Sequence, residues 1–149
     1  MKRVLVLSLF VVSLTWSTLP AQAASTGVRV LKATASVDVA PPGARVVFQA
    51  FATNLGPGPL DLWVGFDYGT LRNIDPDTVR ETCIGPIFAY GYGEWTPDDP
   101  VCEWDEFPEG DIMIVKVVAQ LAGSPHHVAS ITFCAYGGNC KTARIRMTS

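Results

Sequence analysis

The chain has 149 residues, of which 48% are hydrophobic, and its 11 Lys and Arg stand against 14 Asp and Glu. A chain this acidic lacks the basic face that binds nucleic acid or an anionic membrane surface, so neither is expected as a partner. Its 13 glycines and 11 prolines disfavour long helices. The length suits one domain that buries a sizeable core and needs no metal to fold.

The first 23 residues predict a secretory signal peptide. Lys2 and Arg3 form a positive start, residues 4–16 are mostly apolar, and Ala21-Gln22-Ala23 is a small-residue cleavage site. The apolar run is shorter than the roughly 20 residues that cross a bilayer, so no membrane insertion is expected. We therefore expect a secreted domain at 24–149, extracellular or periplasmic, with nine Lys and Arg against 14 Asp and Glu (9 − 14 = −5).

All four cysteines lie in the predicted exported part, and an even count in an oxidising compartment predicts two disulfides. Three pairings are possible, and pairing nearest neighbours in sequence favours Cys83–Cys102 and Cys134–Cys140. The Gly137-Gly138-Asn139 turn would bring the second pair together. A structural zinc site typically has C-x2-C spacings or histidine ligands close to the cysteines. The sequence has neither, so no zinc site is expected.

Hydrophobic residues alternate with a period of two along six runs, which predicts half-buried β-strands. Two short strands are expected near Thr82–Cys83 and Cys102–Trp104, where the alternation weakens, and Gly- and Pro-rich turns separate the runs. The pattern predicts an all-β sandwich. The residues expected to face the core are Leu31, Ala33, Ala35, Val37 and Val39; Val46, Phe48, Ala50 and Ala52; Leu60, Leu62, Val64 and Phe66; Met113, Val115, Val117, Ala119 and Leu121; Ala129, Ile131, Phe133 and Ala135; and Ala143, Ile145 and Met147.

The segment APPGARVVFQAFATNLGPGPLDLWVGF, residues 40–66, joins a Pro-Gly turn, a V-x-F strand, a T-N-x-G-P turn and an alternating strand. Downstream, CEWDEFPEGDIMIVKVVAQL at 102–121 joins a cysteine, a Gly-containing turn and a valine-rich strand. Together they resemble the immunoglobulin-like repeat of bacterial surface proteins catalogued as the eleventh domain of unknown function, over roughly residues 28–147. The cysteine hairpin and the aromatic-rich segment at 85–100 depart from that family's pattern.

The resemblance implies a Greek-key immunoglobulin-like β-sandwich of about seven antiparallel strands. It implies a stalk, spacer or adhesive module and brings no catalytic residues with it. Within the T-N-x-G-P turn, Asn54 is expected to cap the turn with its side chain, and Gly56 and Gly58 are expected to supply positive φ angles.

Catalytic chemistry has little support in the sequence. His126 and His127 are adjacent, so in an extended segment they point to opposite faces and do not easily serve one site. There is no G-x-S-x-G motif, and all cysteines are assigned to bridges. Glycosidase chemistry would need two carboxylates facing one cleft, which 14 acids could supply only by chance. We expect no enzymatic activity, no catalytic residue and no cofactor.

The candidate site is in FAYGYGEWTPDDPVCEWDEFPEGD, residues 88–111, which contains no Lys or Arg. Trp104 and Phe107 are expected in the core, which leaves a tethered aromatic and acidic tip whose rings could stack on sugars. The candidate ligand-binding residues are Tyr90, Tyr92, Trp95, Asp98 and Asp99. A calcium-stabilised loop is the alternative there, with oxygens from Asp98, Asp99, Glu103, Asp105, Glu106, Glu109 and Asp111.

The sequence therefore predicts a secreted, non-enzymatic structural or recognition module, acting in cell-envelope adhesion or protein–protein interaction. The alternative is a carbohydrate-binding module that uses the aromatic and acidic loop. A third hypothesis is a toxin or enzyme inhibitor whose loop enters a cleft. An extracellular protein or a carbohydrate is thus the expected kind of partner, and the sequence leaves its identity and the oligomeric state open.

Overall fold

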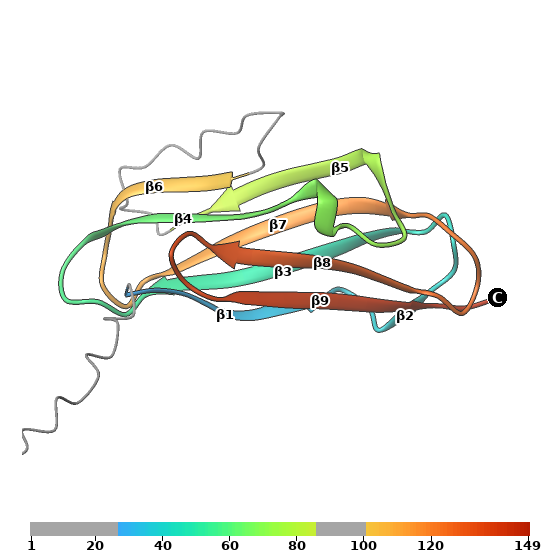
Figure 1. Ribbon diagram of the computed structural model, residues 1–149, viewed down its shortest axis with the longest axis horizontal. Coiled ribbons are helices and arrows are strands. Elements are labelled where there is room, and N and C mark those ends of the chain that lie inside the picture. Colours follow the sequence, from blue (N-terminus) through green and yellow to red (C-terminus); the bar gives the residue numbers. More distant parts are fainter. Residues whose placement is uncertain (1–26, 86–100) are drawn as a thin grey trace, which may run out of the picture.

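The computed structural model describes residues 27–85 and 101–149, and the predicted signal peptide lies outside these ranges (Figure 1). Within them the regular secondary structure consists of β-strands and one short 3-10 helix, η1 (Tyr68–Thr70). No helix in the described ranges is both long and apolar enough to cross a membrane. The strands are β1 (Val28–Ala35), β2 (Val39–Ala40), β3 (Arg45–Asn54), β4 (Leu60–Phe66), β5 (Ile74–Ile84), β6 (Val101–Phe107), β7 (Ile112–Leu121), β8 (Val128–Ala135) and β9 (Cys140–Met147).

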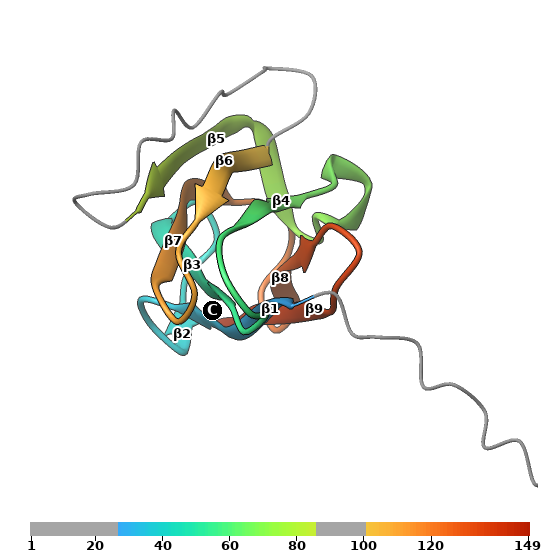
Figure 2. The same cartoon turned by 90° about the vertical axis from the view of Figure 1, so that its left-hand side faces the viewer.

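The strands form two sheets that pack face to face, as the end-on view shows (Figure 2). The four-stranded sheet has the order β1-β3-β7-β5, and the five-stranded sheet has the order β2-β9-β8-β4-β6. An immunoglobulin-like sandwich of the constant type pairs its strands as A-B-E-D and G-F-C. The orders β1-β3-β7-β5 and β9-β8-β4 reproduce that pairing, so the predicted immunoglobulin-like β-sandwich is confirmed.

Nine strands are described, instead of the predicted seven or so. The first addition is β2, a two-residue strand that pairs parallel to β9, so one chain segment contributes to both sheets. The second is β6, which pairs with the outer side of β4 but follows β5 in the chain. The predicted short strands near Cys83 and Cys102 are in fact the ends of these longer edge strands, β5 and β6.

The core follows the alternation for five of the six runs. All the core-facing residues predicted on β3, β4, β7, β8 and β9 are buried, apart from Leu60, which is half-buried beside a β-bulge. Trp104 and Phe107 of β6 are also buried, as predicted, and their rings meet edge to face. Burial of this apolar surface between the sheets is the main force that stabilises the fold.

The prediction for the first run was wrong for Leu31, Val37 and Val39, and Ala33 and Ala35 do pack against the core. The pairing of β1 with β3 shifts by one residue between Val30 and Lys32. Val28 and Val30 are buried before this bulge, Leu31 is 46% exposed, and the inward face resumes at Ala33 and Ala35. A one-residue bulge moves every later side chain to the opposite face, so strict alternation fails there. Val37 and Val39, beyond the end of β1, are also exposed.

Asn54 has the structural role that the sequence predicts. Its side chain is completely buried and donates hydrogen bonds to the carbonyl oxygens of Gly58 (2.8 Å) and Phe107 (3.0 Å). Its Oδ1 accepts a hydrogen bond from the Gly56 N–H at 2.8 Å. One side chain therefore ties the β3–β4 turn to the end of β6.

The two glycines of this turn act differently. Gly58 has a φ of 77°, as predicted, whereas Gly56 is not among the residues with positive φ, so that prediction was wrong. Gly56 serves close packing instead, because a Cβ at this position would come within 2.8 Å of the Leu60 side chain.

Both predicted disulfides are present. Cys83–Cys102 joins β5 to β6 and so links the edges of the two sheets, and Cys134–Cys140 closes the β8–β9 hairpin. The described part of the chain has no free cysteine. Two bridges of this kind indicate an oxidising compartment.

Candidate functional site

The five ligand-binding residues predicted from the sequence all fall in residues 86–100, outside the part of the chain that the structure describes. Their role stays a prediction. They are Tyr90, Tyr92, Trp95, Asp98 and Asp99.

The described acids of the calcium hypothesis do not form a cluster. They spread along β6 and the turn after it, and Glu109 accepts a hydrogen bond from the Gly58 N–H instead. In residues 27–85 and 101–149, the one group of three potential metal ligands consists of Glu81, Cys83 and Cys102. The two cysteines of this group form a disulfide with each other. Because Asp98 and Asp99 lie outside the described ranges, calcium binding in that loop stays a prediction.

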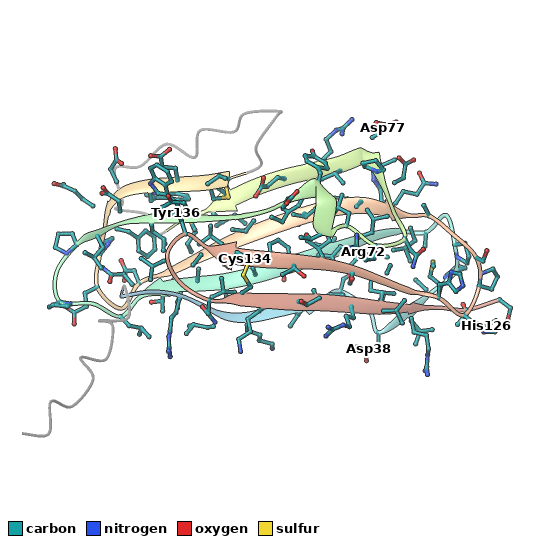
Figure 3. The ribbon with its side chains drawn as sticks, viewed as in Figure 1. Asp38, Arg72, Asp77, His126, Cys134 and Tyr136 are labelled. Atoms are coloured by element: carbon teal, nitrogen blue, oxygen red, sulfur yellow. A yellow bond between two sulfur atoms is a disulfide. The ribbon has the colours of Figure 1, made fainter. Side chains whose placement is uncertain are left out.

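The two histidines lie in the exposed turn between β7 and β8. The His126 N–H donates to the Met147 carbonyl, and the Met147 N–H donates to the His127 carbonyl. Figure 3 shows His126 at one end of the sandwich and Tyr136 toward the other, so His126 and Tyr136 lie far apart.

That surface is a pair of exposed aromatic side chains on the outer face of the five-stranded sheet, Trp63 and Tyr136, called here the aromatic ridge. Their ring centroids are 5.5 Å apart and their planes are inclined by 41°. Trp63 is 40% exposed and Tyr136 is 78% exposed. Rings that remain so open to solvent contribute little to the core, so the pair requires another explanation.

Strand alternation places Trp63 on this face, since its neighbours Leu62 and Val64 both point inward and are buried. Tyr136 directly follows β8, and its N–H donates to the Trp63 carbonyl at 2.9 Å. Antiparallel pairing of Val64 with Ala135 brings the two strands together there. The ridge therefore joins residues 73 positions apart in the chain (136 − 63 = 73).

The β8–β9 hairpin that carries Tyr136 is anchored in three ways. Cys134–Cys140 closes its base. The Asn139 side chain accepts from the Val30 N–H (2.8 Å) and donates to the Val30 carbonyl (2.9 Å). Gly138 packs so closely on β1 that a Cβ there would come within 2.6 Å of the Val28 carbonyl oxygen. An exposed ring on an anchored hairpin loses little conformational entropy when it binds a partner.

Two hollows border the aromatic ridge. The smaller, of about 230 Å³, is lined by Asp61, Trp63 and Tyr136. The larger, of about 290 Å³, is lined by Trp63, Gly65, Phe66, Asp67, Thr70, Val101, Thr132, Cys134 and Tyr136. Each hollow contains one aspartate, and none of the described residues that line them is a Lys or an Arg, so the site suits an apolar group with neutral or basic surroundings.

Sequence reasoning missed both residues of the aromatic ridge. The alternation already placed Trp63 opposite the core face of its strand, and an outward Trp is a usable signal. Tyr136 lies between Cys134 and Cys140 in the sequence, and an aromatic residue within a disulfide-closed turn is a second usable signal. What the sequence does not show is that β4 pairs with β8, and this pairing is what brings the two rings together.

No protein-family model and no curated protein matches this chain. Its structure is similar to that of an alkylpurine DNA glycosylase of Pseudomonas fluorescens bound to DNA with an abasic site analog, at 10% identity and a TM-score of 0.45. That match covers 83% of this chain and 31% of the glycosylase, so the chain spans about a third of that protein.

A second similar structure is AvmM, which catalyses macrocyclization in alchivemycin A biosynthesis, at 14% identity and a TM-score of 0.45 over 83% of this chain and 90% of that one. A third is the sixth cohesin of scaffoldin B from Acetivibrio cellulolyticus in complex with a Cel5 dockerin mutant. Its identity is 7% and its TM-score 0.42, over 77% of this chain and 96% of that one. With TM-scores of 0.45 or lower, these likenesses carry no functional argument.

Proposed function

We propose that this protein is a secreted, non-enzymatic recognition module of the bacterial cell envelope, and that it binds a protein partner on the aromatic ridge. The observation that carries the proposal is the pair of exposed rings, Trp63 on β4 and Tyr136 on the anchored hairpin, that borders two hollows. Trp and Tyr are the residue types most often found at the energetic centre of protein interfaces. The two disulfides support an oxidising, extracytoplasmic setting.

The lining of the larger hollow favours a protein over other partners. Its walls include Phe66, Val101 and the ring of Trp63, which suit an inserted aliphatic or aromatic side chain. Asp61 and Asp67 contribute negative charge to the two hollows. The partner should therefore present an apolar side chain flanked by neutral or basic residues.

Carbohydrate binding is the second candidate function. The specific observation in its favour is that a carboxylate, Asp61, lines the smaller hollow together with both rings. Ring faces stack on the apolar faces of sugars, while a carboxylate accepts hydrogen bonds from their hydroxyl groups. This site differs from the aromatic and acidic tip predicted from the sequence, though both rest on the same chemistry.

The test compares the wild type with Trp63→Ala and Tyr136→Ala. Ile112→Ala is the matched control, because Ile112 is 42% exposed but lies on β7 in the other sheet. Proteins captured from the extracellular and envelope fraction are identified, and the affinity of each purified candidate is measured by calorimetry. We expect the loss of either ring to weaken binding by about 30-fold, as for an interface residue worth about 2 kcal/mol.

All variants should keep the wild-type circular dichroism spectrum, because the substituted side chains are exposed. A partner that binds the two ring variants as tightly as it binds Ile112→Ala would contradict the proposal. Ring-dependent binding to a panel of neutral glycans, without any ring-dependent protein partner, would favour the second candidate function.

A further inference from the structure

The edge strands of the two sheets come together at one place, where the end of β5 approaches the beginning of β6 (Figures 1 and 2). This contact is called here the β5–β6 seam, and Cys83–Cys102 crosses it. Two buried side-chain atoms in the described part of the chain lack a hydrogen-bond partner, and both belong to the seam. They are Oε2 of Glu81 and Nε1 of Trp104.

The two sulfurs of the seam differ in their access to solvent. Cys102 is completely buried, whereas Cys83 is half-buried near the exposed end of β5. A thiolate from solution therefore reaches the sulfur of Cys83 more easily. In thiol–disulfide exchange the attacked sulfur keeps the incoming group and the other sulfur leaves as a thiolate. The departing sulfur would be that of Cys102, and a thiolate is costly in so buried a position.

Glu81 is placed to receive this charge. It points inward two residues before Cys83, and its Oε1 lies 3.5 Å from the Sγ of Cys102. Burial raises the pKa of the Glu81 carboxyl to about 7, so the group retains its proton to near-neutral pH.

Charged groups on the adjoining strands do not face Glu81. Strand alternation points its neighbour Arg80 outward on β5. Lys116 on β7 and Glu103 on β6 also point outward, because each lies between two buried inward residues. Within the described part of the chain, desolvation by burial is accordingly what raises the pKa of Glu81.

We propose that Cys83–Cys102 is an exchangeable disulfide that reacts with an external dithiol, with Glu81 as the acid that protonates the departing sulfur of Cys102. One thiolate of the dithiol forms a bond to Sγ of Cys83, and the Cys83–Cys102 bond breaks with its electron pair on Cys102. The proton moves from the Glu81 carboxyl to Sγ of Cys102. The second thiolate of the dithiol then attacks the first sulfur of the same reagent, which is bound to Cys83. The bond to Cys83 breaks, Cys83 leaves as a thiolate, and the dithiol is oxidised to a disulfide.

Cys134–Cys140 provides an internal control. It lies on the outer face of the five-stranded sheet, with Cys134 half-buried and Cys140 exposed. Glu81, in contrast, belongs to β5 in the other sheet and points into the seam, so its carboxyl has no part in the reduction of Cys134–Cys140.

The experiment measures reduction of each disulfide by dithiothreitol in the wild type and in Glu81→Gln, which keeps the side-chain shape without the acidic proton. Alkylation at intervals, followed by peptide mass spectrometry, gives a rate constant for each bond between pH 6 and pH 9, corrected for the thiolate fraction of the reagent. At pH 6 we expect Glu81→Gln to slow reduction of Cys83–Cys102 at least tenfold and to leave Cys134–Cys140 unchanged. The corrected wild-type rate should fall toward that of the variant above pH 7.

Two further measurements separate acid catalysis from a change in stability. Reduction of native molecules should be independent of urea at low concentrations, and in concentrated guanidinium the wild type and the variant should react equally fast. With glutathione in place of dithiothreitol, the trapped adduct should be on Cys83. The proposal is overturned by equal native rates in the two proteins, by an adduct on Cys102, or by a wild-type rate that rises with urea as steeply as unfolding does.

Discussion

At the scale of single residues, two inward-facing polar side chains, Asn54 and Glu81, have opposite consequences for stability. Asn54 satisfies three backbone groups, so its burial strengthens the structure. Glu81 is half-buried with its Oε2 buried and unpartnered, so desolvation disfavours the charged form and weakens the structure wherever that form prevails. A buried polar group is costly unless hydrogen bonds compensate for its lost hydration.

The first prediction concerns Asn54→Ala. The substitution leaves the Gly58 and Phe107 carbonyls and the Gly56 N–H without their partner. We expect the free energy of unfolding to fall by about 3 kcal/mol, measured by urea denaturation. Gln120→Ala removes an exposed amide from β7 and should change it by less than about 0.5 kcal/mol. A loss below about 1 kcal/mol for Asn54→Ala would show that the turn does not depend on this side chain.

The second prediction follows from the pKa of Glu81, which burial raises from its ordinary 4.5 to about 7. Between these two values the folded protein holds a proton that the unfolded chain has released, so stability falls as pH rises from 4.5 to 7. The loss is complete above pH 7 and amounts to about 3 kcal/mol for a difference of about 2.5 units.

Glu81→Gln should remove this dependence. In urea titrations the variant should match the wild type near pH 4 and exceed its stability at pH 8. Parallel curves for the two proteins over the whole pH range would mean that Glu81 is solvated in the folded state.

At the scale of structural elements, regular alternation was sufficient to predict β3, β4, β7, β8 and β9. It failed in β1, where a bulge displaces Leu31 to the surface. It also missed the length of β5, because an inward Glu81 interrupts the apolar pattern and the pairing with β7 shifts between Asp75 and Arg80. These departures come from irregular backbone pairing and from an inward-facing, half-buried acid, and hydrophobic periodicity detects neither of them.

The third prediction belongs to the β8–β9 hairpin. Asn139→Ala removes both hydrogen bonds to Val30, so the hairpin loses its side-chain attachment to β1. We expect a stability loss of about 2 kcal/mol and faster hydrogen exchange at the Ala135 and Tyr136 amides. Lys141→Ala, at an exposed neighbouring position, should leave both quantities unchanged. If these amides exchange in Asn139→Ala at the same rates as in the wild type, the disulfide alone is sufficient to keep the hairpin in place.

At the scale of the whole molecule, the residue pattern was enough to predict a β-sandwich and both disulfides, and the immunoglobulin-like form was predicted through the family resemblance. The aromatic ridge could not be predicted, because it depends on which strands become neighbours and not on any local pattern. Trp63 and Tyr136 become a pair only when β4 and β8 align in the five-stranded sheet. The same holds for Glu81 and Cys102, which come from strands of different sheets.

The parallel pairing of β2 with β9 has a mechanical consequence. The chain enters β1 at one end of the sandwich and leaves β9 at the other, so these two ends lie apart along the long axis (Figure 1). Tension applied along that axis would load β2 and β9 in shear. The hydrogen bonds from Arg146 to Asp38 and from Thr148 to Ala40 lie across that direction, so they carry the load together instead of opening one after another.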